Sequence, residues 1–155
     1  MKNSIFGIDG CKKGWVIASL KDNQINVSYT PLNKLIFAKK SYLVIDIPIF
    51  LPNCSQDYPR KDEIKAKKIL KNRHGSLFYS PCKKWLDQSL KEINTECSIF
   101  KKPKLSKQSF NLFPHIKDIQ QVKKSHPYIF ESHPELFFLQ RYNIALPKKN
   151  ILGIN

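Results

Sequence analysis

The chain has 155 residues and 41% hydrophobic content, enough for one core, so we expect a single domain and exclude a disordered chain. Lys and Arg number 27 against 12 Asp and Glu, which gives a formal net charge of +15. Such an excess indicates a polyanionic partner, with nucleic acid as the leading candidate and a merely lysine-rich surface as the alternative. No run of about 18 apolar residues occurs, so we expect no membrane span and no secretory leader.

The four cysteines are widely separated in the sequence, at Cys11, Cys54, Cys82 and Cys97. No pair has the spacing of two to four residues that is typical of structural zinc sites. We therefore expect reduced thiols in a cytoplasmic protein rather than a zinc centre or a disulfide framework.

Three strand-like segments open the chain, at residues 4–8, 14–20 and 24–30. Their short connections predict an antiparallel meander. Asp9 and Gly10 follow the first segment, and an Asp-Gly pair between apolar segments favours a hairpin turn. Asp9 is then either a turn residue or a candidate metal ligand, and the local sequence leaves both interpretations open.

A second aspartate, Asp46, lies inside the apolar run at residues 42–49, which follows a short helix expected at residues 32–39. A charge buried within such a strand costs several kcal/mol unless a partner compensates it. A bound cation is one such partner, and an ion pair is the other. We predict that Asp46 is a metal ligand.

The most basic element is a helix expected from Pro59 to about Arg73, because Pro59 suits a first helical position and Gly75 follows the end. Such a helix is either a solvated surface or a surface that contacts phosphate. The residues that we predict to contact nucleic acid share a positive charge: Lys12, Lys13, Arg60, Lys61, Lys65, Lys68, Arg73 and Lys107.

The second half of the chain has two further helical patterns and one strand. We expect a short helix at residues 81–93, a loop at residues 94–104 and a helix at residues 106–124 that Pro114 kinks. A last strand is expected at residues 128–132, and it carries the third candidate carboxylate, Glu131.

The residues after that strand bear on the candidate site. If the extended conformation continues, Glu131, His133 and Glu135 share one face of the strand. His133 is either a group that orients or exchanges a proton with a leaving group or a structural residue beside Pro134.

Several blocks together resemble the domain-of-unknown-function 429 family. They are Gly7-Ile8-Asp9-Gly10, Asp46-Ile47-Pro48-Ile49, Leu105-Ser106-Lys107-Gln108 and Glu131-Ser132-His133-Pro134-Glu135, in this order along nearly the whole chain. The resemblance implies a ribonuclease H-like α/β fold with three layers. It implies a mixed five-stranded sheet in which strands 1–3 are antiparallel, with helices on both faces, and the activity of a predicted nuclease.

The resemblance also implies a mechanism, which is phosphodiester hydrolysis of DNA or RNA assisted by Mg²⁺ or Mn²⁺. Asp9, Asp46 and Glu131 are the implied ligands, with His133 beside them. Family members usually continue to a C-terminal helix that bears a fourth carboxylate, and we expect that this chain lacks that helix. We therefore expect weak or absent activity, and self-association through apolar surface near residues 137–139.

Two other functions fit the same sequence. The chain could be a noncatalytic basic protein that binds nucleic acid. It could also be a phosphate or nucleotide binder of the related actin-like fold, although that fold normally needs two domains and a longer chain.

Overall fold

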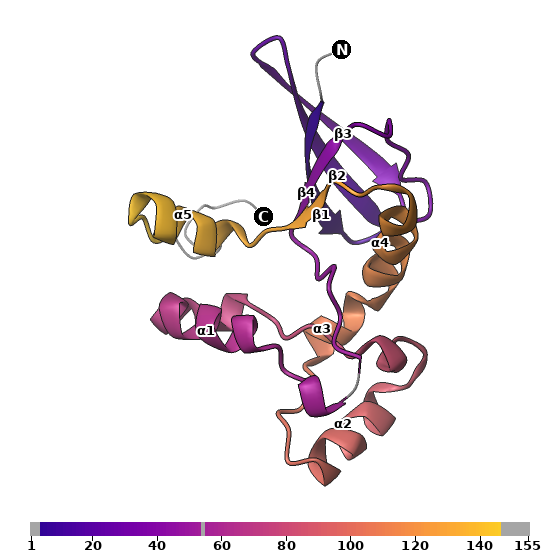
Figure 1. Ribbon diagram of the computed structural model, residues 1–155, viewed down its shortest axis with the longest axis vertical. Coiled ribbons are helices and arrows are strands. Elements are labelled where there is room, and N and C mark those ends of the chain that lie inside the picture. Colours follow the sequence, from indigo (N-terminus) through magenta and orange to yellow (C-terminus); the bar gives the residue numbers. More distant parts are fainter. Residues whose placement is uncertain (1–3, 54, 147–155) are drawn as a thin grey trace.

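The computed structural model describes residues 4–53 and 55–146, which form a five-stranded sheet and a group of helices (Figure 1). The strands are β1 (Ile5–Cys11), β2 (Gly14–Lys21), β3 (Gln24–Pro31), β4 (Tyr42–Ile45) and β5 (Ile129–Glu131). The helices are α1 (Lys61–Leu70), α2 (Leu90–Ile99), α3 (Lys107–Asn111), α4 (Phe113–Ser125) and α5 (Pro134–Tyr142). Short 3₁₀ turns lie at Ser55–Asp57, Lys71–Ser76 and Lys83–Asp87.

The strand order in the sheet is β3-β2-β1-β4-β5. The strands β1, β2 and β3 are antiparallel neighbours, whereas β4 runs parallel to β1 and β5 runs parallel to β4. The predicted meander and the mixed five-stranded sheet are therefore confirmed. The carboxyl ends of the three parallel strands, β1, β4 and β5, lie at one edge of the sheet, which is where ligands bind in open α/β sheets.

The first hairpin turns later than the sequence predicts. Asp9 pairs with Val16 inside the strand ladder, and the turn falls at Lys12 and Lys13. Gly14 fixes this geometry, because a Cβ atom there would lie 2.3 Å from the carbonyl oxygen of Thr30. Asp9 is thus a strand residue, and its interpretation as a turn residue is wrong.

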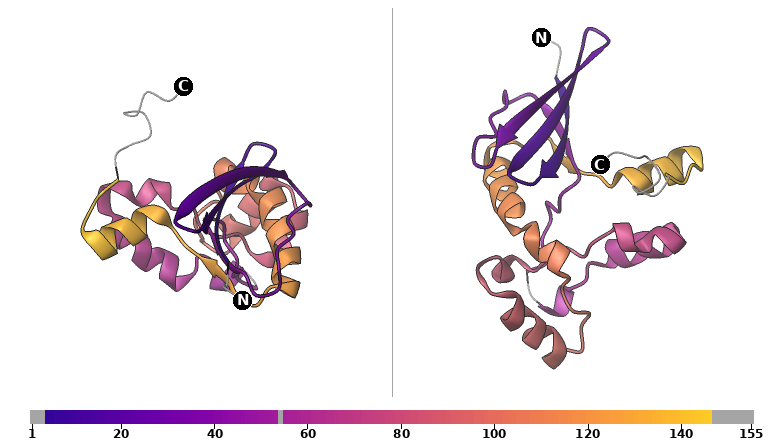
Figure 2. Two further views of the ribbon diagram at one scale, coloured as in Figure 1. Left: turned by 90° about the horizontal axis from the view of Figure 1, so that it is seen from above. Right: turned by 180° about the vertical axis from the view of Figure 1, so that it is seen from behind.

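One face of the sheet packs on α4 and forms the main core (Figure 2). Ile8 and Trp15 from the sheet are buried with Ile116 and Ile119 from α4. A buried hydrogen bond adds to this contact, because Trp15 Nε1 donates to Asp118 Oδ2 at 2.7 Å. The period of two along the strands and the helical period along α4 both present apolar side chains to this layer.

The opposite face of the sheet has no described helix over it. Ile25, Val27 and Tyr29 of β3 point to this face and are 72%, 66% and 55% exposed. In its described part the chain therefore departs from the resemblance, which implies helices on both faces.

The helix predictions fail at three points in the middle of the chain. Residues 32–39 are not helical, and the backbone N–H of Asn33 instead donates to Asp118 on α4 at 2.9 Å. The helix expected at residues 81–93 is a 3₁₀ turn followed by α2. The helix α2 extends into the loop predicted at residues 94–104 and ends at Ile99. Ser89 and Glu92 form a capping box at the start of α2, and this signal marks the true beginning of the helix.

The basic helix predicted from Pro59 to about Arg73 is shorter in the structure, where α1 runs from Lys61 to Leu70 and Pro59 precedes the N-cap Arg60. Proline residues account for two further differences. Pro114 occupies the first turn of α4 instead of kinking one long helix, so the chain forms two helices, α3 and α4. Pro134 likewise begins α5, where the sequence pattern was compatible with continued extension. Because α5 starts there, Glu135 does not share a strand face with Glu131, and that expectation is wrong.

Candidate functional site

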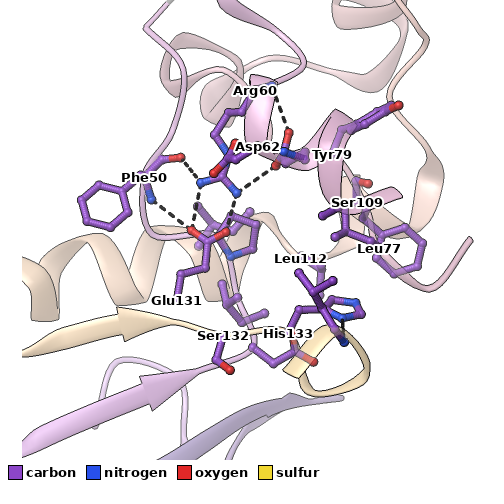
Figure 3. A pocket seen from close by; sticks show the side chains of 18 of the residues that line it. Phe50, Arg60, Asp62, Leu77, Tyr79, Ser109, Leu112, Glu131, Ser132 and His133 are labelled. Carbon is purple, nitrogen blue, oxygen red and sulfur yellow. Dashed lines mark hydrogen bonds and ion pairs between the residues drawn. The ribbon is translucent and has the colours of Figure 1, made fainter. Parts of the chain in front are cut away.

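A pocket of about 830 Å³ opens at the carboxyl ends of β1, β4 and β5 (Figure 3). Its walls come from the strand ends, α1, the start of α4 and the segment that joins β5 to α5. The acidic and basic side chains that line it are Asp9, Asp46, Arg60, Asp62, Glu63, Glu131 and His133. The four residues predicted to be catalytic therefore line a single pocket.

Asp9 and Asp46 come from neighbouring parallel strands. The backbone N–H of Asp46 donates to the carbonyl of Ile8 at 3.2 Å, which places Asp46 beside Asp9 at the end of the ladder. Both aspartates are exposed. Asp46 follows the last residue of β4, Ile45, and is exposed, so its predicted burial within a strand is wrong.

Glu131 lies at the carboxyl end of β5 and is bound by Arg60. Arg60 Nη1 donates to Glu131 Oε2 at 3.0 Å, and Nη2 donates to the other carboxylate oxygen. The backbone N–H of Ile49 also donates to Glu131 Oε2, at 2.9 Å. Both oxygens of the third predicted ligand are thus occupied by donors, in the bidentate geometry that arginine favours with carboxylates.

Arg60 connects three segments of the pocket (Figure 3). Besides Glu131, its guanidinium contacts Glu63 Oε1 at 3.0 Å and donates to the carbonyl oxygen of Phe50 at 2.9 Å. Burial acts to lower the pKa of Arg60, but hydrogen bonds and charges from Glu131 and then Glu63 outweigh it, so the pKa is raised. Arg60 is therefore permanently charged and joins these segments through ion pairs and hydrogen bonds. Its predicted role as a phosphate contact would require it to leave these carboxylates.

Glu63 is a member of this cluster that the sequence predictions did not include. It is 3% exposed and accepts hydrogen bonds from the backbone N–H groups of Ser80, at 2.7 Å, and Arg60, at 3.1 Å. Its position three residues after the N-cap Arg60 is the spacing of a capping box, and that spacing is a signal the sequence contains. Glu63 fixes the position of Arg60, which in turn holds Glu131.

His133 is the N-cap of α5. Its Nδ1 accepts a hydrogen bond from the backbone N–H of Leu136 at 3.3 Å, so Nε2 carries the proton and donates to the carbonyl of Ser76, also at 3.3 Å. Both ring nitrogens are engaged with the backbone. These contacts favour the structural interpretation of His133 over proton exchange with a leaving group.

The carboxylate of Glu135 fastens the same helix to the turn after α1. It accepts hydrogen bonds from Arg73 and from the hydroxyl of Ser76. Burial acts to raise the pKa of Glu135, but these two hydrogen bonds and the charge of Arg73 outweigh it, and the pKa is lowered. Arg73, predicted to contact nucleic acid, is therefore paired within the protein.

The other residues predicted to contact nucleic acid are exposed lysines from three places in the fold. Lys12 and Lys13 form the turn between β1 and β2. The remaining four lie on α1 and at the start of α3: Lys61, Lys65, Lys68 and Lys107.

No group of three or more His, Cys, Asp and Glu side chains arranged to hold a metal ion occurs among residues 4–53 and 55–146. The bidentate pairing of Glu131 with Arg60 gives the physical reason at the predicted site. Asp9 and Asp46 remain as a pair of carboxylates on adjacent strand ends.

The fold and pocket define a mixed α/β protein whose acidic and basic side chains meet at the carboxyl ends of parallel strands. The chain matches the family described as protein of unknown function (DUF429) over residues 7–153, and it belongs to this family. The resemblance seen in the sequence is thereby confirmed. No curated protein and no solved structure matches the chain. Within the described part of the chain, no helix has the length and apolar character needed to cross a membrane.

Proposed function

We propose that this protein is a ribonuclease H-like, metal-dependent nuclease that acts in the cytoplasm, with Asp9 and Asp46 as its primary metal ligands. The observation that carries the proposal is the placement of these two carboxylates side by side on neighbouring strand ends in a pocket. The strand order β3-β2-β1-β4-β5 supports it, as does the net charge of +15, which favours a polyanionic substrate.

The two aspartates fit a hard divalent cation. Mg²⁺ binds through one or two carboxylates and keeps several waters, so Asp9 and Asp46 suffice for one ion, with Mn²⁺ as a substitute. A bound ion would supply an activated water and offset charge on the phosphate that is attacked. Glu131 would join as a third ligand only after Arg60 releases it.

The exchange at Arg60 gives this chain a specific activity profile. While Arg60 holds Glu131, Asp9 and Asp46 would hold one ion, and a second ion to stabilise the leaving oxygen would lack a ligand. If Arg60 moved to a substrate phosphate, its charge would act on the substrate and Glu131 would be available as a third ligand. We expect weak cleavage for this reason.

Metal binding to the Asp46→Asn variant tests the ligand assignment. We expect the affinity for Mn²⁺, measured by calorimetry or electron paramagnetic resonance, to fall at least about tenfold, because one of two anionic ligands is lost. Thermal stability without metal should be unchanged or raised, because the substitution removes one of two neighbouring negative charges. Asp22→Asn, in the exposed turn after β2, is the matched control. A large loss of stability with unchanged Mn²⁺ affinity would identify Asp46 as a structural residue.

Cleavage of labelled single-stranded and double-stranded DNA and RNA, with and without Mg²⁺, tests the activity itself. We expect slow cleavage that requires the metal and is abolished in Asp9→Asn. Equal cleavage by the wild type and Asp9→Asn would overturn the proposal.

The pairing of Glu131 with Arg60 favours one alternative, a noncatalytic protein that binds nucleic acid through its exposed lysines. Its signature is binding that weakens steeply with salt and needs no divalent ion. Replacing Lys61, Lys65 and Lys68 by Met should lower the slope of affinity against salt on a log-log plot by about two to three. A flat plot for the wild type would remove nucleic acid as the partner in both proposals.

A further inference from the structure

The open face of the sheet carries mostly apolar side chains, and Asp9, which pairs with Val16, lies on it at the end next to the pocket. Strand pairing places Ile5 opposite Leu20 and Leu20 opposite Ile25, so alternate residues of the three strands share this face. Tyr128, just before β5, packs on Tyr42, which pairs with Ile5. We define the open sheet face by the large apolar side chains on it: Ile5, Val16, Leu20, Ile25, Val27, Tyr29, Tyr128 and Phe130. Each of these side chains is at least 40% exposed.

A second apolar surface lies on α5. Phe137, Phe138 and Tyr142 form a cluster with ring centroids 5.6–6.1 Å apart, and they are 51%, 37% and 56% exposed. We call them the α5 aromatic cluster. The helix is held at the end of the sheet, beside α1, so this cluster does not lie on the open sheet face of its own chain (Figures 1 and 2).

We propose that two copies of this chain associate by placing the α5 aromatic cluster of each copy on the open sheet face of the other. A strand layer that runs partly parallel is normally covered by helices on both faces, and the described helices cover one. Within the described residues, each copy thus offers a sheet face that no helix covers and the exposed aromatic side of α5. A two-fold arrangement satisfies both surfaces of both copies at once, and it closes without further growth.

The exposed area is enough for a weak, reversible pair. At the observed exposures, the α5 aromatic cluster presents roughly 200–350 Å², since one aromatic side chain carries about 150–250 Å². In a reciprocal pair, each copy buries its own cluster and a footprint of similar size on its sheet, roughly 400–700 Å² in all, which reaches the lower end of the area of specific interfaces. The net charge of +15 on each copy opposes association, and salt screens that repulsion. Dimerisation should therefore strengthen with salt, whereas binding to nucleic acid weakens.

Sedimentation velocity over a range of protein and salt concentrations tests the dimer. Val27→Lys on the open sheet face and Phe137→Lys in the aromatic cluster should each raise the dimer dissociation constant more than about tenfold. Ser28→Lys and Gln140→Lys add the same charge on the same elements, at exposed positions outside the two surfaces, and serve as controls. We expect both controls to dimerise as the wild type does.

Mixing the two disruptive variants tests the reciprocal geometry. In a mixed pair, the aromatic cluster of the Val27→Lys copy meets the intact sheet face of the Phe137→Lys copy, so one of the two contacts survives. We expect the mixture to form more dimer than either variant alone and less than the wild type.

Three outcomes would overturn the proposal. Normal dimerisation of Phe137→Lys together with failure of Val27→Lys would show that two sheets stack directly. A wild-type chain that is monomeric at all salt concentrations would show that copies do not pair. Dimers formed only when the chain ends at residue 146 would show that residues 147–155, rather than a second copy, occupy the face.

Discussion

The helices α4 and α5 attach to the rest of the molecule in opposite ways. Ile116 and Ile119 of α4 are fully buried in the main core against the sheet. Leu136 and Leu139 of α5 are only partly buried, against the small cluster on α1, and the ion pair between Arg73 and Glu135 supplies much of the polar attachment. The attachment of α4 is chiefly apolar, whereas the attachment of α5 combines partly buried apolar contacts with an ion pair.

The difference separates the scaffold from the wall of the pocket. The free energy gained by burying apolar side chains does not depend on pH. The free energy of an ion pair depends on both pH and salt. The sheet with α4 should therefore form the most stable unit, and α1 with α5 should open at lower free energy. Because α1 and α5 line the pocket, conditions that loosen them alter the candidate site without unfolding the sheet.

The largest effect is expected from Ile119→Ala on α4. Ile119 is 0% exposed, so truncation leaves a cavity in the main core and should cost about 4 kcal/mol of unfolding free energy. Chemical denaturation measures this loss. Ile69→Ala on α1, where the side chain is 41% exposed, is the matched control and should cost less than about 1.5 kcal/mol. Equal losses in the two variants would remove the distinction between scaffold and pocket wall.

Arg60→Met should have the next largest effect, about 3 kcal/mol, because it leaves the buried Glu63 without its cation. Denaturation reports the size of the loss, and hydrogen exchange reports its place. We expect lower protection in α1 and unchanged protection in α4. Glu131→Gln is the comparison variant and should cost less, because the Glu131 side chain is 27% exposed and the amide retains one acceptor oxygen. If Arg60→Met leaves the free energy of unfolding unchanged, the cluster of Arg60, Glu63 and Glu131 does not stabilise α1.

A smaller effect, about 1 kcal/mol, is expected from loss of the Glu135 charge. The pKa of Glu135 is lowered in the folded state, so its contribution to stability is present above the unfolded pKa of about 4.3 and is lost as pH falls through the folded value. Hydrogen exchange, corrected for the intrinsic rate, should show α5 opening on acidification below about pH 4 while α4 remains protected. In Glu135→Gln, the opening of α5 should be the same above and below about pH 4. If the opening of α5 still depends on pH in this variant, another group causes the effect.

The smallest effect is expected from Lys117→Met on α4. Lys117 Nζ lies 2.8 Å from Asp87 Oδ1, but the two side chains are 49% and 87% exposed. Exposed pairs of this kind contribute little, so stability should change by less than about 0.5 kcal/mol. Thermal unfolding in low and high salt measures it. A larger loss of stability would mean that charged contacts also hold α4 in place, so α4 and α5 would not differ in this respect.

Local signals in the sequence were sufficient for the three antiparallel strands and for the choice of two candidate ligands, whereas the mixed five-stranded sheet was implied by the family resemblance. The three antiparallel strands follow from alternating side chains and short polar connections, and Asp22 and Asn23 adopt the positive φ values, 49° and 61°, of a two-residue turn. The closeness of Asp9 and Asp46 follows from the parallel pairing of β1 with β4, which the tertiary structure shows. The capping box of Ser89 and Glu92 also indicates the start of α2 in the sequence, although the predicted helix began at residue 81.

The tertiary structure alone decided which charges meet. Arg60 and Glu131 are separated by 71 positions, and no local pattern relates them. Their contact depends on how α1 packs beside β5 and on the buried Glu63 that orients the guanidinium. The same holds for α5, because whether the chain turns into a helix at Pro134 or continues as a strand depends on contacts with the turn after α1.

The sequence by itself therefore determined the approximate positions of the strands, their meander and the choice of Asp9 and Asp46 as candidate ligands. These features depend on side-chain periodicity and on steric limits of the backbone, which act over a few residues. Only the tertiary structure decided that Glu131 is paired with Arg60, that His133 caps a helix and that one apolar face of the sheet is left open by the described helices. These features depend on which distant surfaces pack together, and that choice is made by the free energy of the whole fold.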